Sequence, residues 1–205
     1  SMGWVLDEVK ERIADIAQIV RSLVPIARFG FVAYRDRDDP EFLTRVQPLT
    51  YSTGKLYRFL STLEAKGGGD WFEAIDAGLK DAVEHSGWRL GARKIIIVIG
   101  DAPMKESQLK TVVRIVERFR RQGGTVSTLD VSDQANPHLL EAKVGRKVSR
   151  ALYRAAPMHS FLVIGEAGMG DAATLDGEIK LTKRLITLIM GDRFANEMQA
   201  LLDIL

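Results

Sequence analysis

Acidic side chains follow two apolar stretches of the sequence, and their positions suggest cation chemistry. Asp101 ends the run IIIVIG, and Asp36 follows the run FGFVAY. A further pair, Asp70 and Glu73, stands three residues apart at the start of a predicted helix. Carboxylate oxygens are the ligands that Mg²⁺ prefers in proteins. The alternatives are structural: Asp101 as the cap of the next turn, and Asp70 with Glu73 as a helix-capping pair.

The composition and the motif spacing exclude several other kinds of functional site. The 205 residues include no cysteine, which excludes a disulfide scaffold, a thiolate metal site and a cysteine nucleophile. The three histidines lack zinc-site spacing, no GxSxG elbow is present, and neither TGKL nor GEAGMG completes a phosphate-binding or dinucleotide-binding motif. The net charge of +2 gives no argument for nucleic acid, and no apolar run approaches a membrane span. The sequence slightly favours the cytoplasm without assigning a compartment.

Apolar periodicity predicts alternating helices and strands along the chain. A helix runs from Leu6 and ends near Pro25, because proline disfavours a helical residue before it. We expect further helices over 53–65, with Thr53 as N-cap, and over 71–85, with Asp70 as N-cap, and others over 109–119, 177–190 and 192–205. We expect strands over 28–35, 95–100 and 125–132, and an edge strand containing Pro48. Periodicity leaves FLVIG (161–165) open between a short strand and a buried helix end.

This alternation predicts an α/β fold, a doubly wound and mostly parallel sheet with helices on both faces. Residues 1–205 form a single predicted domain, in which 138–157 is a basic insertion. Ligands of such sheets bind beyond the carboxyl ends of the strands, where Asp36 and Asp101 are expected.

The order WVLDEVKERI, FGFVAYRDRDDP, GGGDWFEAIDAGL and WRLGARKIIIVIGDAP resembles that of a von Willebrand factor A domain. It is similar in particular to the bacterial and α-kinase-associated branch and to the I-like domain of integrin β subunits. The closing stretch from GEAGMG to RFANEM is also similar to the end of such bacterial domains. The resemblance covers most of the chain outside 138–157.

The resemblance implies a metal-ion-dependent adhesion site that holds Mg²⁺ at the carboxyl edge of the sheet. By position, Asp101 matches its last element and Glu73 its acidic middle element. Asp70 matches the first residue of the DxPE pattern, in which Phe72 replaces the proline. Together with Asp70 and Glu73, Asp36 is expected at a second cation site beside the first.

The family's first strand and the front of its DxSxS motif are absent from the chain as given. Ser1 matches the second serine of that motif; alternatively, Ser1 and Met2 are a tag remnant and an internal start. In the family, that strand lies between those expected at 28–35 and 94–100. The sheet must therefore close up, borrow 161–165, or pair with a second chain, and the last alternative predicts a homo-oligomer.

These features predict a non-enzymatic interaction domain that binds an unknown protein partner through a Mg²⁺-dependent adhesion site, incomplete in this chain. Two alternatives remain open. One is a Mg²⁺-dependent phosphatase or phosphotransfer domain that uses Asp101 with Asp36, for which Lys105 is the available cation. The other is a metal-free assembly module.

Overall fold

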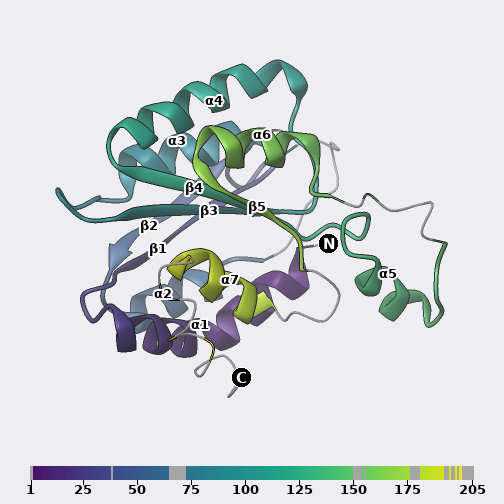
Figure 1. Cartoon of the computed structure of the whole chain (residues 1–205), viewed down its shortest axis with the longest axis horizontal. Coiled ribbons are helices and arrows are strands. Elements are labelled where there is room, and N and C mark those ends of the chain that lie inside the picture. The colour runs from purple at the N-terminus through teal and green to yellow at the C-terminus, as the bar shows by residue number, and fades with distance from the viewer. Residues whose placement is uncertain are drawn as a thin grey trace.

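Helices and strands alternate along most of the chain, as the hydrophobic pattern predicts (Figure 1). The computed structural model describes residues 2–37, 39–64, 73–149, 154, 156–175, 181–191, 194, 197 and 199. The helices are α1 (Gly3–Leu23), α2 (Thr53–Ser61), α3 (Ile75–His85), α4 (Glu106–Arg121), α5 (Pro137–Val144), α6 (His159–Ala167) and α7 (Leu181–Met190). The strands are β1 (Phe29–Tyr34), β2 (Thr44–Thr50), β3 (Lys94–Gly100), β4 (Gly124–Asp130) and β5 (Met169–Ala173).

The described strands form two sheets. β1 and β2 pair antiparallel, whereas β3, β4 and β5 form a parallel sheet in that order. The β3–β4 register is continuous from Lys94 opposite Gly124 to Gly100 opposite Asp130. Among the described residues, β1 and β3 are not paired through their backbones, so the sheet has not closed by direct pairing of these two strands.

The segment 161–165 lies in α6 and does not form a strand. The alternative in which this segment is inserted between β1 and β3 is therefore wrong. Its side chains pack instead against the β3–β4–β5 sheet, where Phe161 and Ile164 are fully buried. The oligomeric state expected from open strand edges stays a prediction.

Helices cover both faces of the strands, which confirms the predicted α/β class (Figure 1). α3, α4 and α6 lie on one face, and their core includes Leu79, Phe119 and Phe161. α1, α2 and α7 lie on the other face, where Leu56 and Ile186 are buried. The carboxyl ends of β1 and β3 are thereby held between two apolar layers.

The long first helix, α1, is amphipathic as its spacing predicts. It ends at Leu23, just before Val24 and Pro25, and buries one apolar stripe that includes Val9, Ile13 and Ile16. Its opposite face carries charged side chains. Among the described residues, no helix is both long and apolar enough to cross a lipid bilayer.

Several predicted helix starts and strands require correction. The N-cap of α2 is Ser52, whose hydroxyl accepts from the Lys55 N–H, and not Thr53. α3 begins at Ile75 with Ala74 in the N-cap position and therefore later than predicted, and the predicted cap Asp70 lies outside the described residues. Pro48 does lie in an edge strand, because β2 pairs only with β1. The sequence analysis missed β5 altogether.

Candidate functional site

Three of the predicted site residues lie at one edge of the molecule, where β1 and β3 end. Asp101 directly follows β3, and Asp36 comes two residues after β1. Glu73 lies just before α3, and its backbone N–H donates to the carbonyl of Pro103 at 3.2 Å, which ties it to the loop after β3. All three carboxylates line one cavity. Ser1 and Asp70, the other two predicted ligands, lie outside the described residues.

Arg35 fixes the loop that carries Asp36. This side chain is only 9% exposed. Its guanidinium donates to Asp39 at 3.0 Å, to Glu41 at 3.0 Å and to the carbonyl of Glu64 at 2.8 Å. Hydrogen bonds from the Glu41 backbone N–H and from Arg35 lower the pKa of Asp39. The acidic residues after β1 therefore have two roles, because Asp39 is used for folding while Asp36 faces the cavity.

Burial and neighbouring charges oppose the ionisation of Glu73 and of Asp101. Burial raises the pKa of Glu73 to about 7, and the neighbouring charges of Asp36 and Asp101 add to the effect. Burial also raises the pKa of Asp101, with smaller contributions from Asp130 and Asp133. One oxygen of Asp101, Oδ2, is buried and has no hydrogen-bond partner among the residues that the structure describes. An unsatisfied buried carboxylate oxygen is costly, and a nearby positive group would reduce that cost.

The described carboxylates only partly fit a metal ion. The unpartnered Asp101 oxygen and the raised pKa of Glu73 are what a cation would relieve. However, no three Asp, Glu, His or Cys side chains within the described part of the chain are grouped closely enough to hold an ion together. These residues alone do not form a closed Mg²⁺ site.

A buried acidic residue at the end of β4, Asp130, escaped the sequence analysis. Its carboxylate is fully buried and accepts from Ser132, from the Met158 N–H at 2.8 Å and from Arg154 at 2.9 Å. The Asn136 amide donates to the Asp130 carbonyl at 2.8 Å. Asp130 is thus satisfied within the fold and is not available to a ligand. The signal was present, since Asp130 ends a strand as Asp101 does.

A cavity of about 960 Å³ lies between β1 and β3, and we call it the β1–β3 slot. α1 and α7 line one side of the slot and α3 lines the other. Its lining is mainly apolar, and the acidic edge with Asp36, Glu73 and Asp101 belongs to the same cavity. The candidate site is therefore the polar mouth of an apolar slot.

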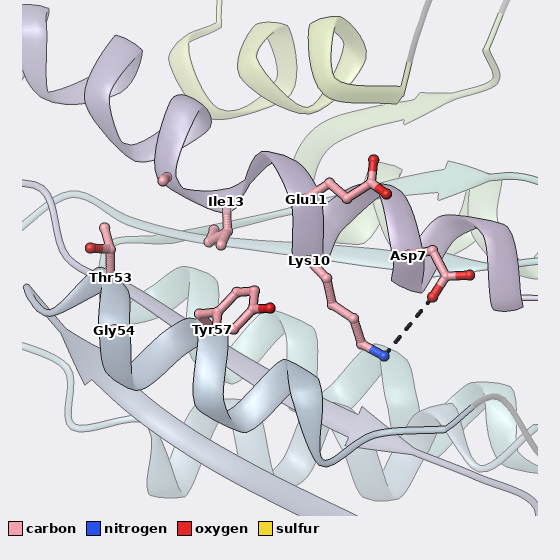
Figure 2. A pocket seen from close by; sticks show the side chains of 8 residues that line it. Asp7, Lys10, Glu11, Ile13, Thr53, Gly54 and Tyr57 are labelled. Atoms are coloured by element: carbon pink, nitrogen blue, oxygen red, sulfur yellow. Dashed lines mark ion pairs between the residues drawn. The ribbon is translucent and has the colours of Figure 1, made fainter.

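A second hollow, of about 670 Å³, lies between α1 and α2 (Figure 2). Lys10 forms an ion pair with Asp7 at 4.0 Å there and donates to the carbonyl of Leu63 at 3.0 Å. Tyr57 lines the floor of this hollow and is 55% exposed. Lys10 and Asp7 are engaged in contacts within the fold, and the predicted carboxylates are not among the lining residues of this hollow.

Comparison with known proteins shows which family the chain resembles. The family model of the von Willebrand factor type A domain matches residues 5–161. A curated relative, "Alpha-protein kinase vwkA" of Dictyostelium discoideum, is 29% identical over 106 residues. That match covers 50% of this chain and 17% of the relative, so the chain spans about a sixth of the relative's length.

Two solved structures share the fold at low sequence identity. The SpRpn10 VWA domain has a TM-score of 0.57 and 14% identity, over 87% of this chain and 80% of that one. The conserved hypothetical protein BatB of Bacteroides thetaiotaomicron has a TM-score of 0.57 and 16% identity, over 90% of this chain and 86% of that one. At these identities the likeness concerns the fold alone.

Proposed function

Because the chain belongs to the von Willebrand factor type A domain family, we propose that it is a protein-interaction domain whose partner binds at the carboxyl edge of β1 and β3. Domains of this family typically mediate protein interactions. The placement agrees with the general position of ligand sites in doubly wound α/β folds, beyond the carboxyl ends of the strands.

The observation that carries this proposal is the gathering of Asp36, Glu73 and Asp101 at that edge, with the pKa of Glu73 raised to about 7. Partly buried carboxylates that repel one another destabilise the free protein. A positive group that approaches them removes this repulsion, which contributes to binding. Perturbed carboxyl groups at the mouth of a cavity are typical of functional sites.

We place a weak divalent-cation site at the same edge. Asp101 and Glu73 are the donors, and the unpartnered Asp101 oxygen supports this assignment. When bound, Mg²⁺ would keep several water ligands and accept a carboxylate from the partner. Because the described carboxylates do not form a three-ligand group, we expect binding no tighter than the millimolar range.

Calorimetric titration with MgCl₂ and MnCl₂ tests this site. The unmodified chain should bind with millimolar Kd, and Asp101→Asn should abolish the signal. The matched control is Asp171→Asn, which changes an exposed carboxylate on β5 outside the slot and should leave binding unchanged. Micromolar binding that Asp101→Asn removes would show that the donor set is more complete than we propose.

Proton release gives a second readout. Because the pKa of Glu73 is about 7, cation binding at pH 7 should displace roughly half a proton from this side chain. Titration in two buffers with different ionisation enthalpies measures that release. We expect it to vanish at pH 9 and in Glu73→Gln. Release that persists in Glu73→Gln would assign the proton to another group.

Phosphoryl transfer, the enzymatic alternative, gains no support from the site. Within the described part of the chain, no lysine or arginine is hydrogen-bonded to the buried Asp101 oxygen. Lys105 is exposed in the N-cap position of α4. The kinase name belongs to the Dictyostelium protein, of which this chain matches 17%. We propose no kinase activity for this chain.

A further inference from the structure

Three hydroxyl side chains of the chain stand three residues after an arginine. They are Ser61 after Arg58, Ser149 after Arg146, and Thr187 after Arg184. Serine/threonine kinases that prefer basic substrates read such a charge pattern, because acidic groups in their cleft pair with the basic residues before the acceptor. In the sequence, Ser149 alone of the three has a second basic residue, Lys147, directly after its arginine.

Two of the three hydroxyl groups are held in helices. Ser61 is the last residue of α2, and its hydroxyl donates to the Tyr57 carbonyl at 2.8 Å. Thr187 lies within α7, and its hydroxyl donates to the Lys183 carbonyl at 2.9 Å. Three residues of a helix cover only about 4.5 Å along its axis. An arginine and an acceptor held in this way cannot spread along the cleft of a kinase.

The third hydroxyl, that of Ser149, lies in an exposed segment without regular structure. α5 ends at Val144, and Gly145 turns the chain away with a φ of 66°. Residues 146–149 form neither helix nor strand, and the side chains of Arg146 and Ser149 are exposed. Within the ranges that the structure describes, the Ser149 hydroxyl makes no hydrogen bond. Such a segment can extend to about 3.3 Å per residue, which lets arginine and hydroxyl reach separate points of a cleft.

The position of α5 gives a kinase access to this segment. α5 buries none of its residues and lies apart from both helix layers (Figure 1). The base of the connection is held by Arg154, which donates to the buried Asp130 at 2.9 Å. A kinase can therefore engage Ser149 while the sheet and its covering helices stay folded.

We propose that Ser149 is a phosphorylation site for a serine/threonine protein kinase that prefers basic substrates, with Arg146 and Lys147 as its recognition residues. A bond forms between the Ser149 Oγ and the γ-phosphorus of ATP, while the bond from that phosphorus to the β–γ bridging oxygen breaks. ADP leaves, and the hydroxyl proton passes to the catalytic carboxylate of the kinase. The kinase and ATP come from outside this chain. The inference does not depend on the partner edge or on a cation there.

The phosphate acts on the turn that follows α5. The Glu141 carboxylate accepts from the Val148 N–H at 3.3 Å and so ties the exposed segment to α5. A phosphoserine at 149 places nearly two negative charges one residue beyond Val148. These charges repel Glu141 and attract Arg146 and Lys147. Phosphorylation should therefore release Val148 from Glu141.

Incubation of the 205-residue chain with the catalytic subunit of cyclic-AMP-dependent protein kinase, Mg²⁺ and ATP tests the site. Intact-mass measurement should show one added phosphate per chain, and peptide fragmentation should assign it to Ser149. Ser149→Ala should abolish the incorporation. No incorporation into the unmodified chain, or phosphate on Ser61 or Thr187 in place of Ser149, would overturn the proposal.

Two arginine variants test the recognition residues. Arg146→Gln should lower the kcat/KM of the kinase for the chain by roughly tenfold, because a charge pair in the cleft is lost. Arg58→Gln is the matched control: it removes the exposed arginine before Ser61 and should leave the rate unchanged. Equal effects of the two substitutions, or none from Arg146→Gln, would contradict the assignment.

Residue-resolved hydrogen exchange measures the effect of the phosphate on the turn. The Val148 amide should exchange roughly two- to tenfold faster in the phosphorylated chain, because it loses the Glu141 carboxylate. The Gly145 amide is the reference, since it donates to the backbone carbonyl of the same Glu141 at 2.9 Å and should change little. Unchanged exchange at Val148, or equal acceleration at both amides, would refute the release of Val148 from Glu141.

Discussion

Replacement of Glu73 by glutamine should change how the stability of the domain depends on pH. The pKa of Glu73 rises from 4.5 to about 7 on folding, chiefly through burial and then through Asp36 and Asp101. Because the folded-state pKa is the higher one, folding favours the protonated carboxyl. The associated stabilisation is complete below pH 4.5 and is lost as the pH rises through about 7.

The magnitude follows from the two pKa values. A change from 4.5 to about 7 corresponds to roughly 3 kcal/mol of unfolding free energy if it acts in full. Glu73 is only partly buried, and solvent screening reduces this to about 1.5 kcal/mol. The neutral glutamine avoids the loss, so Glu73→Gln should match the unmodified chain near pH 4.5 and exceed its stability by about 1.5 kcal/mol at pH 8.

Urea unfolding at several pH values between 4.5 and 8 measures this difference. Other titrating groups contribute to both proteins and cancel in the comparison. The same free energy should appear as a rise in Tm of roughly 3–6 °C at pH 8. Glu166→Gln, on the exposed surface of α6, is the control and should run parallel to the unmodified chain.

Parallel pH profiles for Glu73→Gln and the unmodified chain would refute this reasoning. They would mean that the Glu73 carboxyl stays ionised in the folded protein without cost. In that case the repulsion among Asp36, Glu73 and Asp101 would no longer support a partner site at this edge.

Further substitutions test the parts of the fold around the site. Asp130→Ala should destabilise the chain by about 3–5 kcal/mol in urea unfolding, because Arg154 and the Met158 N–H lose a buried acceptor. Gly124→Ala should cost about 1–3 kcal/mol in thermal unfolding, since the added Cβ would stand 2.3 Å from the Phe119 ring. Its control is Gly54→Ala, whose nearest neighbour is 3.8 Å away and which should be neutral or slightly stabilising. A mild effect of Asp130→Ala would mean that its hydrogen bonds contribute little, and equal effects at the two glycines would contradict the packing argument.

The sequence pattern predicts those parts of the fold that depend on neighbouring residues in the chain. α1 ends where Pro25 requires it, and β3 is the uninterrupted apolar run. Asp36 and Asp101 were correctly expected at one edge, because Asp36 follows β1 closely, Asp101 follows β3 directly, and both residues line one cavity. The family follows from the order of these stretches.

The remaining features depend on tertiary packing. β5 has the sequence MGDAA, in which β-branched residues are lacking. Gly170 belongs there because a Cβ would come within 2.3 Å of the Val126 carbonyl, an approach that only the neighbouring strand reveals. In the same way, 161–165 is helical because its apolar side chains are buried against the sheet. The raised pKa of Glu73 comes from burial and from residues distant in sequence, so no local pattern predicts it.

Arg154 closes the long connection between β4 and α6 at its base. Its side chain bonds Asp130, and its backbone N–H donates to the Gln134 carbonyl at 3.0 Å. The chain that leaves at Gln134 therefore returns to the same point at Arg154, and α5 lies within this connection.

Because the two ends of this connection are held together, a change in its length should affect the stability of the domain only slightly. The entropy of loop closure grows only slowly with length, by about 0.6 kcal/mol for each doubling. Once Arg154 is seated on Asp130 and Gln134, the exposed residues 142–147 can be shortened, lengthened or exchanged while Asn136 keeps its buried hydrogen bonds to Asp130 and Ser132. The exposed part of this connection is thus a place where the length of the chain can change, and where a foreign sequence can be grafted beside the carboxyl edge at little cost.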